Sequence, residues 1–100
     1  MATDAAQLRK AASLLDKRGH VKGHLEDAKG RVCMMGAINL ACTGDASNCG
    51  GRSFDLLDRV ERYLQRKFKK RYVSAIEWNN MASRRKSQVV EALREAARFR

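Results

Sequence analysis

The chain has 100 residues and a formal net charge of +10, with 21 lysine and arginine residues against 11 aspartate and glutamate residues. About 100 residues form one domain around one modest core, which leaves no room for a separate catalytic domain. The apolar content of 44% is that of a folded protein, and no run of roughly 18 apolar residues is present to cross a membrane.

The first residues and the cysteines indicate the compartment. Residues 1–4 read Met-Ala-Thr-Asp, without the basic start and apolar centre of a secretory signal. The three cysteines are an odd number, which does not fit a disulfide framework. We therefore expect a cytoplasmic protein with reduced thiols and no membrane association.

The first half of the chain reads as helices separated by turns. Apolar residues at helical spacing predict a helix near residues 5–17, with Asp4 and Gln7 as its capping box. The helical period then disappears, so residues 21–32 are expected to form a loop or a short β-hairpin. Residues 33–41 are apolar on all sides, which predicts a helix in the middle of the core.

The second half adds further helices after a flexible segment at residues 45–51. Ser53 is expected to cap a long helix, residues 73–81 form a short one, and Ser83 starts the last helix. The inward stripe of the long helix consists of Leu57, Val60, Leu64 and Phe68. The expected fold is a mostly α single domain of four to five helices over residues 1–100.

Basic side chains concentrate in two groups. A helix N-terminus carries partial positive charge and free N–H groups, so three bases there are unfavourable unless an anion joins them. Such a cluster follows Ser83, as Arg84, Arg85 and Lys86, with Gln88 one turn on. The other group, on the face of the long helix opposite its apolar stripe, comprises Arg59, Arg62, Arg66, Lys69 and Lys70.

Both basic groups point to a polyanionic partner, and we expect them to contact nucleic-acid phosphates, of DNA rather than RNA. Residues 73–81 and the last helix also permit a helix-turn-helix in which Ser87 and Gln88 face base edges. Two alternatives stay open. The charges can form a merely solvated surface, or the protein can be an interaction module that binds an acidic surface of a host protein.

Residues for zinc binding and for nucleophilic catalysis are present at unfavourable spacings. The candidate ligands are His20, His24, Cys33, Cys42 and Cys49, without a Cys-x-x-Cys pair. Cys49 with a histidine has the atoms of a nucleophile and a base, but nothing orients the base or supplies an oxyanion site. We expect no metal, no cofactor and no enzymatic activity.

Three short motifs carry a family resemblance. Residues 32–38 read Val-Cys-Met-Met-Gly-Ala-Ile, residues 76–80 read Ile-Glu-Trp-Asn-Asn, and residues 89–97 are amphipathic. The chain resembles a family of small uncharacterised proteins of actinobacteria and their phages, in which a Cys-x-x-Gly-Ala helix and a Trp-Asn-Asp turn precede a terminal helix; Asn80 replaces the aspartate. The resemblance implies a compact helical domain of a bacterial cell or its phage, without assigned activity. It includes Cys33, Gly36, Ala37, Trp78 and Asn79, which read physically as packing and turn positions.

Overall fold

The computed structural model describes residues 3–69 and 74–99, so the predicted site residue Lys70 lies outside the described residues. The fold is a compact single domain, mostly helical as predicted. Its helices are α1 (Asp4–Arg18), α2 (Met34–Thr43), α3 (Ser53–Phe68), α4 (Ala75–Asn80) and α5 (Lys86–Arg98).

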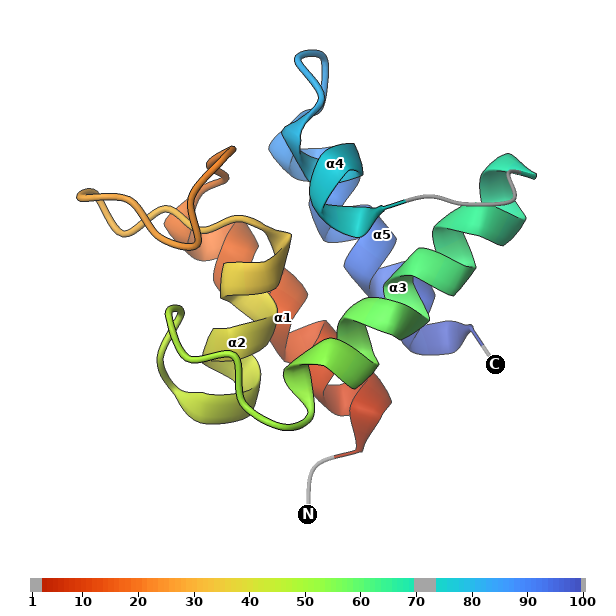
Figure 1. Ribbon diagram of the computed structural model, residues 1–100, viewed down its shortest axis with the longest axis horizontal. Helices are drawn as coiled ribbons and strands as arrows, with labels where there is room; N and C mark the ends of the chain where they lie inside the picture. The colour runs from red at the N-terminus through yellow and green to blue at the C-terminus, as the bar shows by residue number, and fades with distance from the viewer. Residues whose placement is uncertain (1–2, 70–73, 100) are drawn as a thin grey trace.

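The helices pack in two layers around α1 and α5 (Figure 1). These two helices lie side by side and antiparallel, because Lys86 at the start of α5 contacts Asp16 near the end of α1. In Figure 1, α2 lies over α1, and α3 lies over α5. Most of α2 is buried, which confirms the prediction that this apolar helix lies in the core.

The helix starts differ from the sequence prediction at three places. Thr3 rather than Asp4 caps α1, since its hydroxyl accepts a hydrogen bond from the Ala6 N–H at 3.1 Å. Ser53 is the first residue of α3 and not its cap. The last helix begins at Lys86, three residues after Ser83, because the backbone first makes a turn in which the Arg84 N–H donates to Met81 at 2.9 Å.

Residues 19–33 form a loop against the start of α2. The hairpin alternative is not observed, since this segment contains only the isolated bridges His20–Val32 and Glu26–Val32. A side chain at Gly36 would overlap the carbonyl oxygen of Leu25, so the glycine allows the loop to lie directly on α2. The segment that packs closely on Gly36 is therefore the loop of residues 19–33.

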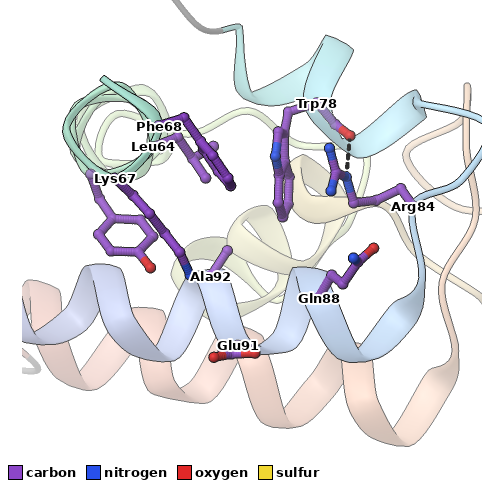
Figure 2. Close-up of a pocket in the computed structure, with 9 residues that line it drawn as sticks. Leu64, Lys67, Phe68, Trp78, Arg84, Gln88, Glu91 and Ala92 are labelled. Atoms are coloured by element: carbon purple, nitrogen blue, oxygen red, sulfur yellow. Dashed lines mark hydrogen bonds between the residues drawn. The ribbon is translucent and has the colours of Figure 1, made fainter. Parts of the chain in front are cut away.

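The apolar stripe of α3 is shorter than predicted. Leu57, Val60 and Leu64 are buried, whereas Phe68 is 45% exposed. Phe68 lies at the last turn of α3, beyond the part of the helix that packs on the core. The prediction that Phe68 lies in the core is therefore wrong. Its ring lies at the surface, next to α4 and α5 (Figure 2).

Candidate nucleic-acid interface

Arg59, the first residue of the predicted stripe on α3, is bonded to the end of α5. Its Nε atom donates to the carbonyl of Ala96 at 2.9 Å, and its Nη2 atom donates to Ala97 at 2.8 Å. The last carbonyls of a helix have no partners within the helix, and a guanidinium satisfies them while opposing the negative end of the helix dipole. Arg59 therefore has a structural role in joining α3 to α5.

Two more arginines of the stripe also have partners within the domain. The Nε atom of Arg62 lies 3.3 Å from the Asp58 carboxylate, and the guanidinium carbon of Arg66 lies 5.8 Å from the centre of the Phe99 ring. Lys69 is exposed and ends α3 in the left-handed conformation, with a φ of 54°.

The surface around the stripe is of mixed charge. Arg59, Arg62 and Arg66 line a groove of about 590 Å³ that also contains Asp4, Asp55, Asp58 and Phe99. The lining therefore contains three aspartates and three arginines, although the Asp4 carboxylate is paired with Arg52. This balance lowers the attraction of the groove for phosphate compared with a face of cations alone.

At the predicted cluster before α5, Arg84 is also held by the fold. Its guanidinium stacks 3.8 Å from the centre of the Trp78 ring, and its Nε atom donates to the Trp78 carbonyl at 2.8 Å (Figure 2). Burial lowers the pKa of Arg84 from its ordinary value.

The other residues of this cluster surround the start of α5. The Gln88 side-chain oxygen accepts a hydrogen bond from the Arg85 N–H at 2.9 Å, and the Lys86 ammonium lies 3.4 Å from the Asp16 carboxylate. Arg85 and Ser83 are exposed. The first turn of α5 contains no acidic residue and receives no side-chain cap from Arg85.

Lys22 joins this end of α5, although nothing in its local sequence predicts that position. The loop after α1 brings its ammonium to 2.9 Å from the carbonyl of Ala82. We call the exposed and partly exposed residues around the first turn of α5 the α5 N-terminal surface. It consists of Lys22, Ser83, Arg85, Lys86 and Gln88.

The two predicted basic groups lie at opposite ends of α5. Arg59 contacts the last carbonyls of this helix, whereas Arg85 and Lys86 form its start. The 13 residues of α5 span about 20 Å at a rise of roughly 1.5 Å per residue. The two groups therefore do not form one continuous surface.

A small pocket adjoins the α5 N-terminal surface between α3, α4 and α5. It has a volume of about 220 Å³, and its apolar lining includes Leu64, Phe68 and Trp78. Figure 2 shows the indole of Trp78 between the side chain of Arg84 on one side and those of Phe68 and Leu64 on the other. Sequence reasoning did not identify this pocket, because it placed Phe68 in the core.

The chain matches a family of unknown function, DUF6197, over residues 1–99. The chain belongs to this family. No curated protein and no solved structure matches the chain. In the described part of the chain, no helix is long and apolar enough to cross a membrane.

In this DUF6197 chain, Trp78 and Asn79 lie in α4 and not in a turn, so their expected turn positions are wrong, and Asn79 joins α4 to α2 and to the loop after α1. The Oδ1 atom of Asn79 accepts the Met34 N–H at 3.0 Å and lies 2.8 Å from the Nε2 atom of His20. Its Nδ2 atom donates to the carbonyl of Val21 at 3.4 Å. The backbone groups that Asn79 satisfies therefore belong to α2 and to the loop after α1, and not to its own segment.

The cysteines of this DUF6197 chain have mainly packing positions. Cys33 is buried at the start of α2, where its Sγ atom accepts the Gly36 N–H at 3.4 Å, and burial raises the pKa of its thiol. Cys42 is half-buried and Cys49 is exposed. Across residues 3–69 and 74–99, no three histidine, cysteine or acidic side chains are grouped so as to hold a metal ion.

Proposed function

We propose that the protein is a non-catalytic binding protein whose α5 N-terminal surface contacts the phosphates of nucleic acid, with DNA as the preferred partner. One observation carries this proposal: basic residues converge on a helix N-terminus that has no acidic residue in its first turn and no side-chain cap from Arg85. Free N–H groups and the positive end of the helix dipole favour an anion at such a position. Lys22, Arg85 and Lys86 add three positive charges there, and the Asp16 carboxylate, 3.4 Å from the Lys86 ammonium, offsets one of them.

The total charge supports the same partner. A net charge of +10 attracts DNA and RNA over distances of about 10 Å, the screening length at 0.1 M salt. In this proposal Arg62, Arg66 and Lys69 add to the general attraction without forming the main contact, because the groove beside the first two contains three aspartates. Arg59 and Arg84 mainly stabilise the fold, because each donates hydrogen bonds to backbone carbonyls within the domain.

The setting that we propose is the cytoplasm of a bacterial cell, where a chromosomal or phage-encoded protein meets nucleic acid directly. The resemblance of the 32–38 and 76–80 motifs to actinobacterial and phage proteins supports this setting. The alternative partner is an acidic surface of a host protein. It would use the same cations, so only an experiment separates the two.

The proposal is tested by fluorescence anisotropy with labelled duplex DNA, single-stranded DNA and RNA of equal length. We expect binding at about 50 mM salt that weakens steeply by about 200 mM, because each neutralised phosphate releases counterions. Absence of binding to all three at low salt overturns the proposal. A pull-down from a nuclease-treated bacterial lysate that still recovers one stoichiometric protein favours the host-protein alternative.

A further inference from the structure

We infer that the pocket between α3, α4 and α5 binds one unstacked base of a single-stranded nucleic acid, and this inference rests on the proposed phosphate contacts of the α5 N-terminal surface. Gln88 belongs to both places, because it lies in the first turn of α5 and also lines the pocket. Arg84, which also lines the pocket, directly precedes Arg85 of that surface. A strand whose phosphate lies at the helix start therefore has a base within reach of the pocket.

The pocket offers one exposed aromatic ring, that of Phe68, beside the indole of Trp78, which is only 8% exposed. One face of the Trp78 indole is covered by the Arg84 guanidinium at 3.8 Å, and the other side faces Phe68 (Figure 2). Phe68 is 45% exposed on the outside of the domain. Every base has a π-face, so aromatic side chains beside a basic surface are typical of proteins that bind single strands.

The size of the pocket restricts its occupant. The volume of about 220 Å³ is below the roughly 300 to 1,000 Å³ of sites for drug-sized ligands. It suits one flat ring system and excludes a base pair. We therefore expect an unpaired base, which single-stranded nucleic acid presents without the cost of opening a duplex.

The polar edge of the pocket fits the edge of a base. The Gln88 side-chain oxygen is occupied by the Arg85 N–H at 2.9 Å. Within the described residues its Nε2 atom has no hydrogen-bond partner, so this atom is the available donor for a carbonyl or ring nitrogen of a base. Lys67 and Glu91 also line the pocket, and together they add no net charge to it. The phosphates are therefore attracted by the α5 N-terminal surface and not by the pocket.

Trp78 is the only tryptophan of the chain, so its fluorescence reports directly on the pocket. The test compares an oligothymidylate with an abasic oligonucleotide of the same length and phosphate count. We expect the oligothymidylate to quench Trp78 emission and to bind about 5- to 150-fold more tightly than the abasic strand. The abasic strand is expected to bind by its phosphates alone, without this quenching.

A pair of variants separates stacking from a general loss of apolar surface. Phe68→Ala should weaken oligothymidylate binding at least about 5-fold and leave the abasic strand unaffected. Phe54→Ala is the matched control, because Phe54 is also exposed, at 59%, and lies at the other end of α3. It should change neither affinity.

The outcomes distinguish the two proposals. Equal binding of both strands without quenching overturns the base pocket and leaves phosphate binding intact. Unchanged oligothymidylate affinity of Phe68→Ala also overturns the pocket. Absence of binding to either strand overturns the base pocket, whereas the proposed phosphate contacts are overturned only if duplex DNA and RNA also fail to bind at low salt.

Discussion

The Nε2 atom of His20 lies 2.8 Å from the Oδ1 atom of Asn79, and this contact ties the loop after α1 to the end of α4. The same Oδ1 atom accepts the Met34 N–H at 3.0 Å, so it is an acceptor and His20 must donate from Nε2. Neutral His20 therefore carries its proton on Nε2. Burial lowers the pKa of His20, and the charge of Lys22 acts in the same direction.

This pKa shift predicts a loss of stability in mild acid. The pKa of His20 is lower in the folded state than the ordinary value of 6.5, so the unfolded state binds more protons as the pH falls through that value. The contribution of His20 to the free energy of unfolding is complete above pH 6.5 and decreases below it. Urea denaturation at about pH 7.5, 6.5 and 5.5 measures this dependence.

His20→Gln is the matched variant for the pH prediction. Glutamine keeps an N–H donor for the Oδ1 atom of Asn79 but does not titrate. The difference in unfolding free energy between about pH 7.5 and 5.5 should therefore be smaller in the variant than in the parent protein. Parallel pH curves for the two proteins would show that His20 is not the titrating group.

Gly36→Ala is expected to destabilise the fold by disturbing the contact between α2 and the loop after α1. The new methyl group would overlap the carbonyl oxygen of Leu25, so the loop must move. Overpacking of this kind costs about 1–3 kcal/mol. The midpoint of urea unfolding should fall accordingly.

Gly51→Ala is the control for this substitution. Among the described residues, no atom lies within 4 Å of the place that its Cβ would take. Its effect on the free energy of unfolding should remain within about 0.5 kcal/mol. If both alanine variants unfold at the same urea concentration, close packing at Gly36 is not the reason for the glycine.

The sequence predicted the helices well because their signals are local. Apolar spacing located α1 and α3 to within a few residues, and the apolar character of residues 33–41 predicted the burial of α2. The start of α5 was predicted too early at Ser83, because the turn before it depends on Arg84 stacking on Trp78. That contact belongs to tertiary structure, and no local pattern reports it.

Arg59, Arg62 and Arg66 line one groove, but their partners could not be predicted. Helical spacing shows that Arg59, Arg62 and Arg66 share a side of α3. It does not show that the end of α5 lies beside Arg59 or that Asp4 enters the same groove. A count of charges therefore overestimated the cations that are free to meet phosphate.

Arg59→Ala is expected to destabilise the fold more than the neighbouring Arg62→Ala. Arg59 donates two hydrogen bonds to the end of α5, and their loss should cost about 1–2 kcal/mol. Arg62 forms an exposed pair with Asp58, so its loss should cost about 0–0.5 kcal/mol. Each variant removes one positive charge, and urea unfolding of the two at equal salt measures the difference. Equal losses of stability would contradict the bridging role of Arg59.

The proposed phosphate contacts predict which charges control the salt dependence of binding to duplex DNA. Each phosphate contact contributes about 0.9 to the slope of log affinity against log salt concentration. Removing Arg85 and Lys86 together, as Arg85→Ala with Lys86→Ala, should therefore reduce the slope by up to about 1.8. Arg62→Ala with Arg66→Ala removes the same charge from the groove that contains three aspartates, so its slope should change less. Anisotropy titrations at several salt concentrations measure both slopes. A larger change of slope in the variant with Arg62→Ala and Arg66→Ala would show that the phosphate contacts lie in the groove beside α3 and not at the start of α5.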